Sequence, residues 1–181
     1  VHISNISMMN DYVKDVPLIA YELADKFWPG PLTMVLPKKD VIPFTTSGGL
    51  DTVGIRFPSN IIAQEIIKVC GKPLAAPSAN LSGSPSPTTA IHVFEDMNNR
   101  IPAIVDGGSC EVGVESTVIS FEGDCVRLLR PGYISLEDIK SVTENVIADK
   151  GILNKINSTD KVLSPGMKYK HYSPKANVII I

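Results

Sequence analysis

The chain has 181 residues and a formal net charge of −2, from 17 Lys and Arg against 19 Asp and Glu. Hydrophobic residues make up 44% and charged residues 20%, which is typical of a globular protein and excludes a disordered or fibrous one. The charge balance argues against a dedicated binder of nucleic acid or anionic membranes. Three cysteines without metal-binding spacing, and no apolar run of about 20 residues, predict a cytoplasmic protein without a membrane span.

Hydrophobic periodicity and capping residues predict four helices, over residues 12–27, 60–70, 87–97 and 136–147. The expected N-caps of the last three are Ser59, Ser86 and Ser135. Runs of β-forming residues predict five strands, over residues 32–36, 52–57, 101–105, 116–121 and 125–130. Because strands and helices interleave without strict alternation, we expect an α/β fold with a twisted, open, mixed sheet flanked by helices.

The helix expected over residues 60–70 has an apolar stripe of Ile62, Ile66 and Val69. Residues after 148 change character, because a polar, aperiodic stretch leads into a segment rich in Pro, Lys and Tyr. We therefore divide the chain into a first domain over 1–148, a linker or lid over 149–174, and the first strand of a second α/β domain over 175–181.

The strand over residues 52–57 has an unusual face. Alternation places Thr52, Gly54 and Arg56 on one side of the sheet and Val53, Ile55 and Phe57 on the other. A Thr-Gly-Arg face makes a poor core but a good pocket floor, since an arginine can bind a carboxylate through two parallel hydrogen bonds. The alternative is an exposed sheet face.

Ser78 and Asn80 lie in a turn after a short apolar run, where hydroxyl and amide groups can hold phosphate oxygens. The alternative is an ordinary turn whose polar side chains bond their own backbone. Arg130 ends a strand, where it can reach a polyphosphate or cap the hairpin. Glu111 and Glu115 form a pair suited to acid–base chemistry, although a solvated loop explains them better.

Several ordered sequence blocks resemble the threonylcarbamoyl-AMP synthase family, in its longer two-domain form built on a YrdC-like domain. They cover residues 27–33, 52–58, 73–80, 84–90, 106–108, 115–118, 129–132 and 164–174. The resemblance extends over about residues 1–174. It implies a nucleotidyltransferase that forms threonylcarbamoyl-AMP and pyrophosphate from L-threonine, bicarbonate and ATP. That product supplies the threonylcarbamoyladenosine modification of tRNA, through a downstream tRNA threonylcarbamoyl transferase.

The same resemblance implies roles for individual residues. The implied threonine contacts are His2, Arg56, Ala76 and Ser116. The implied ATP contacts are Thr52, Ser78, Ser86, Arg130 and one lid tyrosine, either Tyr172 or Tyr169. Arg56, Ser78 and Asn80 are the implied catalytic residues. Mg²⁺ is expected with ATP, held mainly by phosphates and water because no protein side chains form a metal cage in the sequence pattern.

The chain departs from the family pattern at both ends. The family's basic Lys/Arg segment before the His2 strand and most of its second domain are absent, so we expect a chain truncated at both ends. Two other functions stay open. One is a related enzyme that forms carbamoyl-AMP. The other is an RNA-binding module, for which the net charge of −2 predicts at most weak RNA binding.

Overall fold

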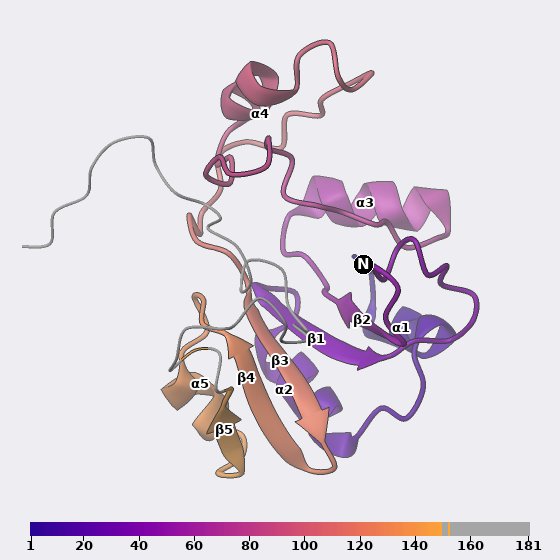
Figure 1. Cartoon of the computed structure of the whole chain (residues 1–181), viewed down its shortest axis with the longest axis vertical. Coiled ribbons are helices and arrows are strands. Elements are labelled where there is room, and N and C mark those ends of the chain that lie inside the picture. The colour runs from indigo at the N-terminus through magenta and orange to yellow at the C-terminus, as the bar shows by residue number, and fades with distance from the viewer. Residues whose placement is uncertain (150–151, 153–181) are drawn as a thin grey trace, which may run out of the picture.

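A computed structural model describes residues 1–149 and residue 152 (Figure 1). Its centre is a five-stranded sheet with the order β2-β1-β3-β4-β5. The strands are β1 (Leu32–Pro37), β2 (Thr52–Ile55), β3 (Thr117–Glu122), β4 (Cys125–Arg130) and β5 (Val146–Ala148). The pairs β1–β2 and β3–β4 are antiparallel, whereas β1–β3 and β4–β5 are parallel. The predicted mixed α/β sheet is therefore confirmed.

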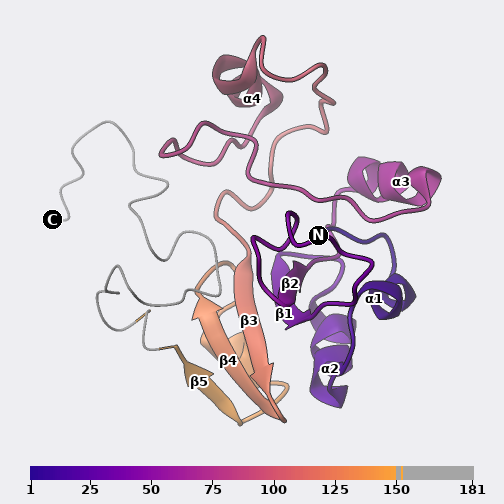
Figure 2. The same cartoon turned by 45° about the vertical axis from the view of Figure 1, so that its right-hand side comes forward.

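Five helices accompany the sheet within residues 1–149: α1 (Ile6–Tyr12), α2 (Leu18–Phe27), α3 (Ile61–Cys70), α4 (Ala90–Met97) and α5 (Leu136–Lys140). Side chains of α1, α2 and α5 belong to the main hydrophobic core. By contrast, α4 lies apart from the sheet in both views (Figures 1 and 2). None of the helices within residues 1–149 has the length and hydropathy that a membrane span requires.

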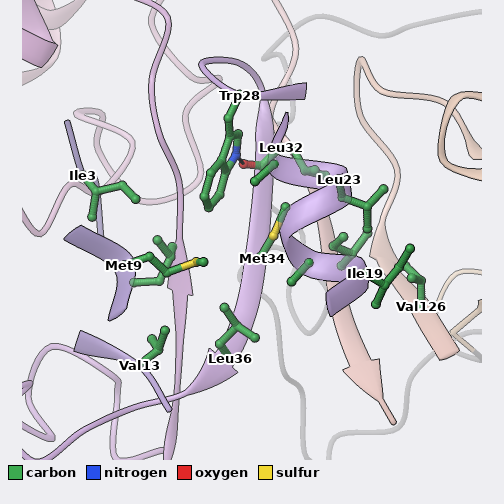
Figure 3. Packing of buried hydrophobic residues seen from close by; sticks show 14 of the residues in the cluster. Ile3, Met9, Val13, Ile19, Leu23, Trp28, Leu32, Met34, Leu36 and Val126 are labelled. Atoms are coloured by element: carbon green, nitrogen blue, oxygen red, sulfur yellow. Dashed lines mark hydrogen bonds between the residues drawn. The ribbon is translucent and has the colours of Figure 1, made fainter. Parts of the chain in front are cut away.

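The core lies on one face of the sheet. Alternate side chains of β1, which are Leu32, Met34 and Leu36, are buried against Met9 of α1 and Leu23 of α2 (Figure 3). Because successive strand residues point to opposite faces, this register sends Thr33 and Val35 to the other side. The helices α1, α2 and α5 thus pack on one face of the sheet, and Thr33 and Val35 lie on the other.

Three predicted helix starts are corrected by the structure. The helix expected over residues 12–27 begins only at Leu18, after Pro17 as its N-cap, and Tyr12 is instead the last residue of α1. Asn60 replaces Ser59 as the cap of α3, since its Oδ1 accepts from the nitrogen of Ala63 at 3.1 Å. Thr89 replaces Ser86 as the cap of α4.

Two other predicted elements are also wrong. The last helix does begin after Ser135, but it ends at Lys140, and Val146 and Ile147 instead extend the sheet beside β4. Pairing with an available strand edge outweighs the local helical pattern there. Residues 101–105 form no strand, because none of the described residues pairs with their backbone.

The predicted apolar stripe of α3 does not face the core. Ile62, Ile66 and Val69 are 43%, 37% and 83% exposed, and Ile67 is the buried residue of this helix. The periodicity correctly predicted a helix, but it could not specify which side packs. The helix ends at Gly71, whose φ of +64° suits glycine, as the sequence predicted. The predicted division into 1–148, 149–174 and 175–181 stays a prediction, since residues 150–151 and 153–181 lie outside the described part.

Candidate functional site

The candidate site occupies the sheet face opposite the core. As predicted, Val53 and Ile55 are buried while Thr52, Gly54 and Arg56 share the other face. A small apolar cluster of Val35, Val118 and Leu129 lies on this second face and forms its floor. Ligand sites commonly combine such an apolar floor with a few convergent polar groups.

Arg56 is fixed at the end of β2 by its backbone and by its side chain. Its nitrogen donates to the carbonyl of Val1 at 2.9 Å, and its own carbonyl accepts from the nitrogen of Ile3 at 2.9 Å. Its Nε donates to the carbonyl oxygen of Gly30 at 3.0 Å. A Cβ on Gly30 would lie 2.3 Å from the carbonyl oxygen of Phe27, so this close approach requires glycine. The loop before β1 therefore orients the guanidinium.

His2 lies between Arg56 and Leu74 in a short extension of the sheet. It forms a parallel bridge with Arg56 and an antiparallel bridge with Leu74. Since Ile3 is fully buried in the core, alternation places His2 on the site face. Burial, with smaller contributions from nearby positive charges that include Arg56, lowers the pKa of His2 from 6.5 to about 4. At neutral pH the imidazole is therefore uncharged.

Ser116 is the junction of the site at the start of β3. Its hydroxyl lies 2.8 Å from the hydroxyl of Thr33 on β1. Arg130, at the end of β4, donates to the Ser116 carbonyl from Nη2 at 2.8 Å and from Nε at 3.2 Å, and its Nη2 also reaches the Ser116 hydroxyl at 3.3 Å. Ser116 is 9% exposed. Residues from β1, from the start of β3 and from the end of β4 therefore contact one another at Ser116.

The electrostatics of this face suit an anion. Burial lowers the pKa of the Arg56 guanidinium, negative charge on the nearby Cys110 sulfur would oppose that shift, and the positive charge of Arg130 adds to it. The arginine stays protonated, because a guanidinium keeps its charge in proteins. Two arginines close enough to influence each other, one of them partly desolvated, favour carboxylate or phosphate groups.

The loop after Leu74 carries the other predicted residues. Ala76 and Ser78 are exposed, and Ala79 adopts a φ of +52°, a left-handed conformation that is uncommon outside glycine. Such strained backbone often occurs at functional sites. Asn80 donates from Nδ2 to the carbonyls of Leu81 and Ser84, both at 2.9 Å. Its Oδ1 is buried and has no hydrogen-bond partner among the described residues.

The structure brings together four of the predicted residues and separates the rest. His2, Arg56, Ser116 and Arg130 share one face and interact directly or through neighbours. Thr52 lies on the same face, four residues from Arg56 and so roughly 13 Å along the chain. Within the described residues, no hydrogen bond joins Ser78 or Asn80 to either arginine. Tyr169 and Tyr172 lie outside the described residues.

Four further residues support the site, although we expected none of them to do so from the sequence. They are Gly30, Thr33, Glu115 and Gly132. A Cβ on Gly132 would lie 2.5 Å from the carbonyl oxygen of Glu115, so this glycine packs directly on the backbone of the Ser116 segment. Glu115 accepts a 2.6 Å hydrogen bond from the Ser86 hydroxyl, although we expected a solvated loop. The Pro-Gly pairs at 29–30 and 131–132 indicated turns but not these contacts.

Comparisons with known proteins identify the family of this chain. A family model described as telomere recombination, which groups Sua5, YciO and YrdC, matches residues 1–132. A second model, described as the C-terminal domain of threonylcarbamoyl-AMP synthase, matches residues 134–181. The chain belongs to the Sua5, YciO and YrdC family of threonylcarbamoyl-AMP synthases. The resemblance drawn from the sequence blocks is therefore confirmed.

Individual relatives give the same result. The chain is 46% identical to the threonylcarbamoyl-AMP synthase of Pyrococcus abyssi, over 100% of this chain and 53% of the relative. It is 48% identical to that of Bacillus subtilis, over 99% of this chain and 51% of the relative. The chain thus spans about half the length of these curated relatives.

Solved structures match in the same way. The crystal structure of P. abyssi Sua5 complexed with L-threonine has a TM-score of 0.90 at 46% identity, covering 97% of this chain and 51% of that one. The crystal structure of E. coli YciO has a TM-score of 0.64 at 25% identity, covering 75% of this chain and 66% of that one. The mixed α/β fold is shared with both.

Proposed function

We propose that this chain carries the catalytic face of an L-threonylcarbamoyladenylate synthase. The enzyme would form threonylcarbamoyl-AMP and pyrophosphate from L-threonine, bicarbonate and ATP. The observation that carries the proposal is the junction of Arg56, Arg130 and Ser116 on one sheet face, in a chain 46% identical to a protein solved with L-threonine. The product would pass to a tRNA threonylcarbamoyl transferase, for the modification of tRNA.

Arg56 is the group we assign to the threonine carboxylate. Its Nε is occupied by the Gly30 carbonyl at 3.0 Å, which holds the guanidinium plane while its terminal nitrogens can form two parallel bonds to a carboxylate. The neutral His2 beside it can exchange hydrogen bonds without competing for the negative charge. The Ser116 hydroxyl supplies a further polar group at the same junction.

The reaction itself would need dry, preorganised surroundings. Threonine that has reacted with bicarbonate is a labile carbamate, so water must be excluded before the carbamate oxygen attacks the α-phosphorus and pyrophosphate leaves. Negative charge increases on the transferring phosphoryl oxygens. A positive group near them, such as Arg130, stabilises that charge without moving, since Ser116 already holds its guanidinium.

Magnesium would enter with the ATP phosphates. The described residues hold no cluster of three His, Cys, Asp or Glu side chains suited to a metal ion. They do offer the buried, unpartnered Oδ1 of Asn80, and hard divalent cations prefer oxygen ligands. When bound, the ion would neutralise phosphate charge.

Ser78, beside Asn80, and Thr52 are the other residues that we assign to the nucleotide. Ala76 would line the amino-acid pocket. The free thiols Cys70, Cys110 and Cys125 suit a cytoplasmic setting.

The test is mass spectrometry of the natural full-length protein mixed with ATP, bicarbonate and single amino acids. We expect threonylcarbamoyl-AMP and pyrophosphate release that requires bicarbonate. Threonine should be preferred over serine and valine, because a site that hydrogen-bonds the threonine hydroxyl is left with unpaired groups when valine enters. Equal turnover of valine, or carbamoyl-AMP as the product, would contradict the proposal. A steeply salt-dependent RNA affinity without any adenylate product would indicate an RNA-binding module instead.

A further inference from the structure

Glu115 makes the most specific contact that the proposed function leaves unexplained. The Ser86 hydroxyl donates to Glu115 Oε1 at 2.6 Å, across 29 positions of sequence. Both residues are only partly exposed. A serine implied in ATP binding is thereby held by a carboxylate that the sequence placed in a solvated loop.

The backbone of Glu115 is fixed. Its carbonyl packs against Gly132, and the carbonyl of the next residue, Ser116, accepts two hydrogen bonds from Arg130. Ser86 is less constrained, because it lies in the stretch 77–89, which contains no helix or strand. The Glu115 side chain therefore extends from a rigid strand start to a loop.

The loop has few other connections to the sheet. Among the described residues, the backbone bond from the Cys110 nitrogen to the Thr88 carbonyl at 2.8 Å joins it to the segment leading into β3. Leu81 is held by Asp96 of α4, away from the sheet. The Ser86–Glu115 bond is thus a direct side-chain connection between the loop and the edge of the site.

We infer that Glu115 is a positioning residue that fixes Ser86 and sets the polarity of its hydroxyl toward the nucleotide. This inference rests on the proposed function, since it assumes that Ser86 faces ATP. A serine has one hydroxyl proton, and here that proton is directed at Glu115. The remaining lone pairs of Ser86 Oγ can only accept hydrogen bonds.

Because Ser86 Oγ can only accept further hydrogen bonds, it must contact a part of ATP that donates them. An unprotonated phosphate oxygen offers no hydrogen, and the Glu115 carboxylate would repel it. The ribose hydroxyls and the exocyclic amine of adenine are hydrogen-bond donors. Ser86 therefore contacts a donor group of the nucleoside, while the phosphates are left to the arginine side of the site.

The experiment measures ATP binding by calorimetry and steady-state kinetics with the natural full-length protein. The variants are Glu115→Ala, Glu115→Gln, Ser86→Ala and the double variant Glu115→Ala with Ser86→Ala. Glu111→Ala is the matched control, because Glu111 is an exposed carboxylate of the same segment. The nucleotide probes are ATP, 2′-deoxy-ATP, 3′-deoxy-ATP and inosine triphosphate, which lacks the amine.

We expect Glu115→Ala to weaken ATP binding by about fivefold, the usual net effect of one lost hydrogen bond. The KM for threonine should stay within about twofold, and Glu111→Ala should change neither. The double variant should be no worse than Ser86→Ala, since both residues act through one hydroxyl. Glu115→Gln should retain part of the affinity, because its amide oxygen still accepts. One of the three analogues lacks the donor group that Ser86 contacts. Wild type and Glu115→Ala should bind that analogue with equal affinity.

Three results would overturn the inference. They are tighter ATP binding by Glu115→Gln, which indicates a phosphate beside the carboxylate; additive losses in the double variant; and an unchanged difference with all three analogues. Failure of the proposed function is distinguishable from these results. A protein with this Glu115-dependent ATP binding that makes no threonylcarbamoyl-AMP would refute the synthase alone, and a wild type that binds no ATP would refute both.

Discussion

Arg130 holds Ser116 by its backbone and its side chain at once, with Nη2 at 2.8 Å from the carbonyl oxygen and 3.3 Å from the hydroxyl. The family resemblance implies that Arg130 contacts ATP and Ser116 contacts threonine. In the proposed enzyme, this contact would couple the threonine and ATP sites through one guanidinium. The same hydrogen bonds fix both the position of Ser116 and the position of the Arg130 charge.

The first prediction concerns the two arginines of the site, Arg56 and Arg130. Arg56→Ala should weaken threonine binding by on the order of 2–5 kcal/mol, because a desolvated pair with the carboxylate is lost. Arg130→Ala should weaken both ATP and threonine, since it also releases Ser116. Isothermal calorimetry with each substrate measures this. Arg127→Ala is the control, since this arginine pairs with Glu122 on the exposed end of the β3–β4 hairpin. An Arg130 variant with normal threonine affinity would refute the coupling.

The second prediction concerns the hydroxyl pair. Thr33→Val keeps the methyl that lies near Gly54 but removes the 2.8 Å hydrogen bond to Ser116. We expect threonine affinity to fall by about 1 kcal/mol, the typical net value of such a bond. Thr33→Ser restores the hydroxyl and should restore most of the affinity. If valine and serine at this position behave alike, the hydroxyl pair has no role in binding.

The third prediction concerns Gly132. An alanine Cβ there would lie 2.5 Å from both the Glu115 carbonyl oxygen and the Thr117 nitrogen, so the segment leading into β3 must shift. We expect Gly132→Ala to lower the free energy of unfolding by about 1–3 kcal/mol, the typical cost of overpacking, and to raise the KM values of both substrates. Urea unfolding and kinetics check this.

Gly113→Ala is the matched control for that substitution. An added Cβ at Gly113 would meet nothing nearer than the Thr88 side chain at 4.0 Å. It should leave the free energy of unfolding within about 0.5 kcal/mol of wild type. Equal effects of the two alanines would show that the close packing at Gly132 is unimportant.

The sheet could be predicted from the sequence because its signals are local. Alternation in β1 and β2, and the hairpin of β3 and β4, depend on residues a few positions apart. The site depends on contacts across long separations, such as Thr33 to Ser116 over 83 positions and Ser86 to Glu115 over 29. No periodicity encodes such contacts. Alternation within β2 indicated Arg56, but Ser116 was identified only by resemblance, Glu115 was assigned to a solvated loop and Thr33 was missed.

The fourth prediction concerns pH. The pKa of His2 is near 6.5 in the unfolded chain and about 4 in the folded protein, so the unfolded state binds more protons between these values. Stability from the neutral imidazole is therefore complete above pH 6.5 and is lost as the pH falls toward 4. Wild type should lose about 2 kcal/mol more than His2→Gln between pH 7 and pH 5. Urea unfolding at both values checks this, and equal losses would contradict it.

The last prediction tests the orientation of α3. Ile67 is 1% exposed and Val69 is 83% exposed, although the periodicity grouped Val69 with the buried stripe. Ile67→Ala should therefore reduce the free energy of unfolding by about 2–5 kcal/mol, through lost burial and the cavity left behind. Val69→Ala removes a side chain that is already in water, and alanine has the higher helix propensity, so stability should stay within about 0.5 kcal/mol of wild type. Urea unfolding of the two variants compares the two sides of one helix. A large loss at Val69 with little at Ile67 would show that α3 is rotated and that the stripe of Ile62, Ile66 and Val69 packs against the core.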